Sequence, residues 1–165
     1  MTENEYQTIV HPFTPIYDSS CKILILGTLP SVKSRENDFY YGHSQNRFWT
    51  VLSRLLCEPL PQTVEEKTDL LQRHHIALWD VIYQCDIKGS SDSSIRNVIS
   101  TDLQPIFRTA PIENIFANGM KAGKLYQKYQ YPMTKREITV LPSTSPANAA
   151  WNLERLTEAW SVILK

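Results

Sequence analysis

The sequence has few cysteines, and their spacing suits neither a disulfide framework nor a metal centre. Cys21, Cys57 and Cys85 are an odd number and contain no CxxC pair. Small disulfide scaffolds and structural zinc sites use paired, closely spaced cysteines. Neither metal ligands nor iron–sulfur ligands are evident, so no metal and no cofactor are implied. We interpret the three thiols as buried core residues.

A long apolar run is also missing. No stretch approaches the roughly 18 residues that a membrane-spanning helix needs. The first residues, MTENEYQTIVHPF, are acidic and polar, whereas a secretory signal peptide would be basic and then apolar. We therefore expect no membrane partner and a cytoplasmic location.

Neither sign of charge is in excess. The 17 Lys and Arg residues balance the 17 Asp and Glu residues, so the net charge does not indicate a polyanionic partner. A local basic surface can still exist, because several basic residues lie close together in the chain: Lys121, Lys124, Lys128, Lys135 and Arg136.

Several common catalytic motifs are absent. The segment GTLPS at residues 27–31 lacks the GK[ST] ending of a P-loop and the GxGxxG of a dinucleotide fold, which argues against ATP or NAD chemistry. The sequence has no HExxH pattern, and no GxSxG elbow surrounds the hydroxyls of PSTSP. A zinc protease and a serine hydrolase are therefore poor candidates.

Strand and helix patterns alternate along the 165 residues, which have the size of one domain, 1–165. Apolar runs predict buried strands at residues 22–26, 76–85 and 113–119 and from residue 137 onwards. Helical spacing or capping residues predict helices at residues 45–57, 63–75, 120–129 and 151–164, and a short one from Thr101 or Asp102 to Phe107. Residues 86–97 are expected to form a polar loop, and the N-terminal segment a lead-in with Pro12 and Pro15.

This alternation predicts an α/β fold, a three-layer α/β/α sandwich around a central, mainly parallel four-stranded sheet. Ligands bind such sheets beyond the carboxyl ends of the strands. The four segments that leave strand ends are GTLPS, WDVIYQCD, ANG and LPSTSPAN. We expect the functional site to be assembled from them.

Four strings in order, GTLPS, YYGHSQNRFW, FANG and LPSTSPANA, resemble the uracil-DNA glycosylase superfamily over residues 22–160. The strings GHSQNRFW and PSTSPAN are most similar to its family 6, the hypoxanthine (deoxyinosine) DNA glycosylases. The resemblance implies a monomeric base-excision repair enzyme that flips a deaminated base, in the first place hypoxanthine, out of double-stranded DNA and leaves an abasic site. Two alternatives stay open: a uracil or mismatch-specific glycosylase, and a DNA- or nucleoside-binding module that cleaves nothing.

One departure from the superfamily pattern directs attention to Asn46. Members that excise uracil in the best-known way carry Asp or Asn two residues after the Gly of the first motif, where this chain has Leu29. An alkyl side chain cannot orient water. In the hypoxanthine family the catalytic amide is assigned to the Asn of the GHxxNRFW string, which is Asn46 here and is expected to orient the water with its carbonyl. The alternative for Asn46 is a helix-capping residue.

The resemblance also assigns the remaining site residues. Tyr41 matches the position whose ring stacks on the extruded base, while Tyr40, Phe48 and Trp49 are interpreted as core and pocket wall. Base recognition falls to Gly27, His43 and Asn118, although His43 could instead cap the helix and Asn118 could be a turn residue before Gly119. The DNA-binding loop comprises Ser143, Thr144, Ser145, Pro146 and Asn148, with residues 146–148 as the wedge. Asp80 and residues 89–94 receive no role beyond shaping the pocket or contacting DNA.

Overall fold

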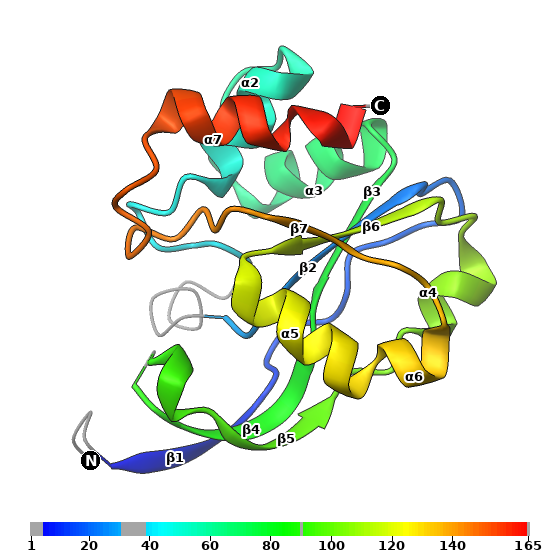
Figure 1. The fold of residues 1–165 in the computed structure, drawn as a ribbon. Coiled ribbons are helices and arrows are strands. Elements are labelled where there is room, and N and C mark those ends of the chain that lie inside the picture. Colours follow the sequence, from blue (N-terminus) through cyan, green and yellow to red (C-terminus); the bar gives the residue numbers. More distant parts are fainter. Residues whose placement is uncertain (1–4, 31–38, 90, 165) are drawn as a thin grey trace.

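The computed structural model describes residues 5–30, 39–89 and 91–164. Its centre is a four-stranded parallel sheet in the order β3-β2-β6-β7 (Figure 1). The strands are β2 (Ile23–Gly27), β3 (Ile76–Asp80), β6 (Asn114–Asn118) and β7 (Thr139–Leu141). The predicted mainly parallel four-stranded sheet is therefore confirmed.

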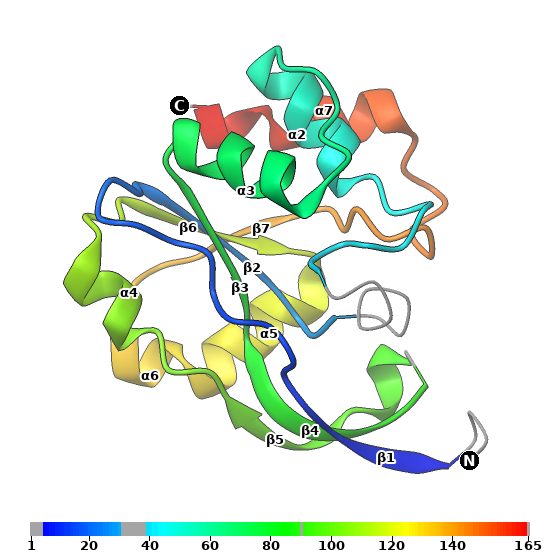
Figure 2. The same ribbon diagram turned by 180° about the vertical axis from the view of Figure 1, so that it is seen from behind.

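Helices cover both faces of this sheet, as Figures 1 and 2 show from opposite sides. One face carries α2 (Phe48–Leu56), α3 (Val64–Arg73) and α7 (Leu153–Trp160), the last of which continues into the 3₁₀ turn η2 (Ser161–Leu164). The other face carries α4 (Gln104–Thr109), α5 (Met120–Tyr129) and α6 (Tyr131–Thr134). The predicted three-layer sandwich is thus also confirmed.

Alternation within β2 explains why the sheet needs cover on both sides. Leu24 and Leu26 are fully buried in the core beneath α4 and α5, whereas Ile25 is fully buried in the core beneath α2, α3 and α7. Successive strand residues point to opposite faces. A strand that is apolar at every position can therefore be stable only between two layers.

Side-chain hydrogen bonds to backbone N–H groups mark the starts of α3 and α4. The Thr63 hydroxyl accepts a hydrogen bond from Glu66 N at 3.0 Å, as the capping-box spacing predicts. The predicted helix at residues 102–107 begins slightly later, at Gln104, whose N–H donates to Asp102 Oδ1 at 3.0 Å. The N-cap is Leu103, so neither predicted residue is the cap: Asp102 bonds Gln104 from one residue before it, and the Thr101 hydroxyl donates to the backbone oxygen of Asp80.

A second, antiparallel sheet was not predicted. It has the order β1-β4-β5 and comprises β1 (Tyr6–Val10), β4 (Ile82–Lys88) and β5 (Arg96–Ser100), with the short 3₁₀ turn η1 (Asp92–Ser94) between the last two. The expected single strand at residues 76–85 is in fact divided at Val81 between the two sheets. The expected polar loop at 86–97 is wrong at both ends, because an antiparallel ribbon with one solvent-facing side tolerates alternating polar residues.

One expectation about the cysteines is also wrong. Cys21 and Cys85 are buried, but Cys57 is exposed and lies in the left-handed region, φ 56°, where it ends α2. Within the part of the chain that the structure describes, no helix is both long and apolar enough to cross a membrane.

Candidate active site

A cavity of about 760 Å³ lies beyond the carboxyl ends of β2, β3 and β6. The four segments predicted to contribute all reach it. It is lined by residues from the sequence-predicted set, namely Gly27, Tyr41, His43, Asn46, Asn118, Ser143, Thr144, Ser145 and Pro146, and also by Leu29 and Asp80. Asn148 does not line it, and Ser31 of GTLPS lies outside the described residues.

A chain of hydrogen bonds links the two asparagines of the cavity through Thr144. The Thr144 N–H donates to Asn118 Oδ1 at 3.0 Å, and Asn118 Nδ2 donates to Thr144 Oγ1 at 3.0 Å. The Thr144 hydroxyl then donates to Asn46 Oδ1 at 2.9 Å. Because a backbone N–H can only donate, this chain fixes the orientation of the Asn118 amide and the direction of each bond after it.

Asn46 also holds the first residue of α2, from just before the N-cap Arg47. Its Oδ1 accepts from Phe48 N at 2.9 Å as well as from the Thr144 hydroxyl. Both lone pairs of the carbonyl oxygen are therefore occupied. Asn46 Nδ2 has no acceptor among the described residues, so the amide offers the cavity hydrogen-bond donors rather than an acceptor. Asn46 is thus not the N-cap of α2, and its carbonyl oxygen is not free to orient water as expected.

Hydrogen bonds within the segment 143–151 stabilise its conformation. Ser143 Oγ accepts from Ser145 N at 3.1 Å, Ser145 Oγ accepts from Ala147 N at 3.1 Å, and Asn148 Nδ2 donates to the Ser143 backbone oxygen at 3.0 Å. The Thr144 side chain has no exposed surface. Its hydroxyl is therefore engaged inside the protein, whereas Ser145 and Pro146 are half-buried at the cavity rim.

Arg47 connects this segment to α2 by hydrogen bonds. It was not singled out from the sequence. Its guanidinium donates to the backbone oxygens of Ser145 at 2.9 Å, Asn148 at 3.2 Å and Trp151, and its own N–H donates to Thr144 O at 3.1 Å. A planar guanidinium with five donors suits such convergent carbonyl groups. The only sequence signal was its place in the NRFW string.

Tyr41 combines an unusual backbone with a buried hydroxyl. Its φ of 54° is uncommon for a residue with a side chain. One face of its ring stacks on Phe48, with centroids 4.2 Å apart, and its hydroxyl has no hydrogen-bond partner of standard geometry among the described residues. Burial and then the nearby Asp80 raise the pKa of Tyr41, with the Asn118 amide opposing them, so the hydroxyl stays protonated.

His43 stands at the cavity wall with a defined proton position. Its Nδ1 accepts from Gln45 N at 3.0 Å, and its backbone oxygen accepts from Asn46 N at 2.9 Å. In the neutral ring the proton is therefore on Nε2, which makes that atom a donor. His43 stabilises the turn that leads into α2, rather than capping the helix itself.

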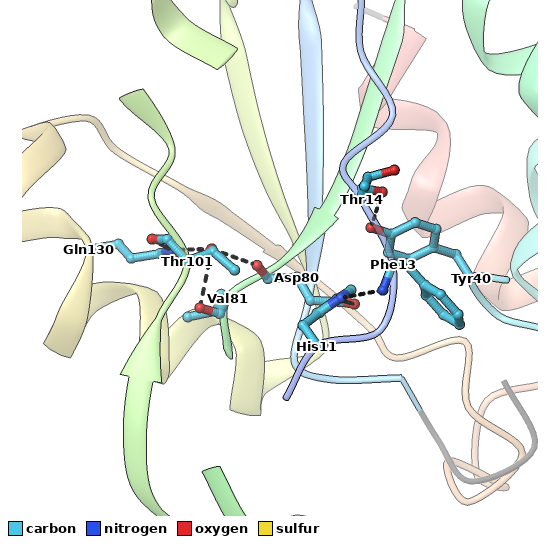
Figure 3. A network of polar contacts seen from close by, with 8 residues as sticks. All are labelled: His11, Phe13, Thr14, Tyr40, Asp80, Val81, Thr101 and Gln130. Carbon is cyan, nitrogen blue, oxygen red and sulfur yellow. Dashed lines mark hydrogen bonds and ion pairs between the residues drawn. The ribbon is translucent and has the colours of Figure 1, made fainter. Parts of the chain in front are cut away.

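A buried carboxylate and imidazole meet at the base of the cavity. Asp80 Oδ2 and His11 Nε2 are 2.7 Å apart, and both side chains are at least 96% buried. His11 Nδ1 accepts from Phe13 N at 3.1 Å, so Nε2 carries the proton that faces Asp80 (Figure 3). Sequence reasoning gave Asp80 no specific role and did not consider His11.

Gly27 is required by this arrangement. A Cβ built on Gly27 would lie 2.4 Å from Asp80 Oδ1 and 2.8 Å from Tyr41 Oη. Any larger residue would displace one of these groups. The described residues contain no cluster of three or more His, Cys, Asp or Glu side chains that could hold a metal ion.

The fold, the motifs and the cavity that they line can be compared with known proteins. Residues 14–164 match the family model of the uracil DNA glycosylase superfamily. The chain belongs to this superfamily. Two relatives named hypoxanthine DNA glycosylase cover 93% of the chain and 96% of their own length: that of Methanosarcina acetivorans is 34% identical and that of Methanosarcina barkeri 31%.

The fold also matches a solved member of the superfamily. A solution NMR structure from Methanosarcina acetivorans, provisionally named a uracil DNA glycosylase, has a TM-score of 0.78 and 33% identity, and the match covers 92% of this chain and 93% of that one. The resemblance read from the four strings is therefore confirmed. His11 lies outside the residues that match the superfamily model, so a family pattern could not have pointed to it.

Proposed function

We propose that this superfamily member is a monofunctional DNA glycosylase that releases hypoxanthine from deoxyinosine in double-stranded DNA and leaves an abasic site. The reaction class follows from the superfamily. The observation that carries the proposal is the convergence of Asn46, Asn118 and Thr144, from three separate motifs, on one cavity beyond the sheet. The names of the two relatives favour hypoxanthine over uracil or a purely binding role.

Breaking an N-glycosidic bond places positive charge on the sugar and negative charge on the departing base. An amide is no general base near neutral pH, so geometry and preorganised donors must supply most of the acceleration. Asn46 meets this requirement with its free Nδ2 hydrogens, because Phe48 and Thr144 hold its oxygen. In this proposal Asn46 is catalytic through its donors, which stabilise charge on the leaving base.

To reach the bond, the enzyme must flip the nucleotide out of the duplex. Tyr41 presents the ring face opposite Phe48 for stacking on the extruded base, an interaction worth roughly 1 to 3 kcal/mol. Asn118 and His43 offer donors along the cavity wall. Ser143, Ser145, Pro146 and Asn148 lie on the loop that would meet the DNA, whereas Thr144 acts from beneath it through Asn46 and Asn118.

The first experiment measures base release. Duplexes that contain a single deoxyinosine, deoxyuridine or xanthine nucleotide are incubated with the purified protein, and abasic sites are cleaved with alkali. We expect strand cleavage at deoxyinosine. If none of the three duplexes is cleaved, the enzyme proposal is wrong and the alternative of a non-catalytic binding module is favoured.

The second experiment separates the two ends of the Asn46 amide. Asn46→Asp keeps an oxygen that accepts from Phe48 and Thr144 but removes the Nδ2 donors, and Asn46→Ala removes both. We expect both variants to lose on the order of 100-fold or more in the rate of base release. Asn114→Ala, at the exposed opposite end of β6, is the matched control and should be fully active. An active Asn46→Asp would contradict catalysis through the donors.

A further inference from the structure

Asp80 differs from the other carboxylate that the described residues contribute to the cavity. Asp92 is exposed on η1, whereas Asp80 is 3% exposed at the end of β3. Its backbone oxygen accepts from the Thr101 hydroxyl at 2.8 Å, and Gln130 in turn donates to that hydroxyl at 2.8 Å (Figure 3). The backbone of Asp80 is therefore held through Thr101 and Gln130, the latter between α5 and α6, and its side chain is held by His11.

His11 determines which oxygen of Asp80 is left for a ligand. Its Nε2–H occupies Oδ2 at 2.7 Å, while Oδ1 lies over Gly27. Tyr41 Oη converges on the same small volume over Gly27. A buried charged acceptor and a buried hydroxyl without a partner among the described residues thus stand side by side at the base of the cavity.

The depth at which Asp80 and Tyr41 lie in the cavity decides which part of an extruded nucleotide would contact them. The sugar of an extruded nucleotide stays joined to the DNA backbone at the cavity mouth, so the most deeply placed groups face the edge of the base. Deamination of adenine changes that edge. N1, a lone-pair acceptor in adenine, becomes N1–H in hypoxanthine, and the 6-amino group becomes a carbonyl.

We propose that Asp80 reads this changed edge, with Asp80 Oδ1 accepting N1–H from a base that stacks on Tyr41, and that His11 is a positioning residue for Asp80. Adenine would place its N1 lone pair against the carboxylate and be rejected, because neither atom can donate. This inference rests on the proposed function and adds a basis for its selectivity. Guanine shares the N1–H and O6 edge, so adenine is the base that tests it.

Asp80→Asn tests the proposal most directly. The His11 Nε2–H would hold the new amide by its oxygen and turn the NH₂ group toward the ligand, which replaces an acceptor with a donor. We expect hypoxanthine release to fall on the order of 100-fold, as for loss of a hydrogen bond to a charged group. Affinity for abasic-site DNA, which has no base, should stay within about twofold of wild type.

Three further variants complete the test. His11→Gln can still donate to Asp80 and should retain activity that His11→Ala loses, so this pair decides the question even if Asp80→Asn does not fold. Asp86→Asn is the matched control, because Asp86 accepts from Thr8 and Asn97 in the β1-β4-β5 sheet, away from the cavity.

Free bases provide an independent measurement. Hypoxanthine should inhibit the wild-type enzyme as a competing ligand, adenine should not, and Asp80→Asn should lose this difference. Wild-type release of hypoxanthine by Asp80→Asn, or an equal loss of abasic-site affinity and rate, would overturn the inference. A wild-type protein that cleaves no substrate would instead overturn the proposed function.

Discussion

The Thr144 hydroxyl fixes the orientation of two asparagine amides that belong to different motifs. It accepts from Asn118 and donates to Asn46, and Thr144 has no exposed surface. A residue in this place acts on a bound nucleotide only through its neighbours. Its contribution should therefore appear in the chemical step and not in DNA affinity.

Thr144→Val removes the hydroxyl at nearly constant volume and leaves Asn118 Nδ2 and Asn46 Oδ1 each without one partner. We expect the rate of hypoxanthine release to fall about 10- to 100-fold, and stability to fall by about 1–3 kcal/mol because a buried amide loses its partner. Thr144→Ser restores the hydroxyl and should restore the rate. A single-turnover assay with measured Kd for abasic-site DNA separates the two effects, and a rate loss that Ser does not rescue would exclude the positioning role.

At the scale of elements, the site depends on one clamp between α2 and the segment 143–151. Arg47, immediately before α2, donates to three backbone oxygens of that segment. Its Nε is buried without a partner among the described residues. Packing as well as hydrogen bonds therefore holds the guanidinium in place. The clamp sets how far the loop stands from the amide of Asn46.

Arg47→Ala should release the loop while the sheet stays intact. We expect faster hydrogen exchange at the amides of residues 145–151, a stability loss of about 2–4 kcal/mol and clearly weaker binding of abasic-site DNA. Arg54→Ala, in the last turn of α2, is a suitable control, since Arg54 has no side-chain bond to the loop. Unchanged exchange in the loop would show that its internal bonds suffice without the clamp.

The elements also show where sequence reasoning succeeds and where it ends. The parallel strands were predictable because β2, β3 and β6 are short apolar runs followed by turn residues. The β1-β4-β5 sheet was not, because its strands mix polar and apolar residues and β1 pairs with β4 across 82 positions, Tyr6 with Lys88. Asn46 and Asn118 were found as residue types within motifs, but the contact of Thr144 with Asn46 spans 98 positions and only the fold reveals it.

For the molecule as a whole, buried tyrosines should limit stability in alkali. Tyr40 is 2% exposed and its hydroxyl donates to Thr14 O at 2.8 Å. Burial above all, and then the charges of Asp80 and Tyr41, raise the pKa of Tyr40 far above its ordinary value of 10.0. Burial likewise raises the pKa values of Tyr41 and Tyr126.

A tyrosine pKa that is raised in the folded state makes the protein less stable at high pH. The folded protein holds these phenolic protons more tightly than the unfolded chain, so their contribution to stability is complete below pH 10 and is lost as the pH rises above it. Each such tyrosine steepens the fall by about 1.4 kcal/mol per pH unit. Urea unfolding between pH 9 and pH 11.5 should therefore show a decline that begins near pH 10.

Tyr40→Phe tests the assignment without touching the proposed base contacts. It has no proton to lose and no hydroxyl for Thr14, so the variant should be less stable at pH 8 yet lose stability less steeply above pH 10, by about 1.4 kcal/mol per pH unit. Tyr83→Phe is the control, because Tyr83 is 46% exposed and its removal should leave the slope unchanged. Equal slopes for wild type and Tyr40→Phe would mean that the region around Tyr40 opens and releases its proton before the sheet unfolds.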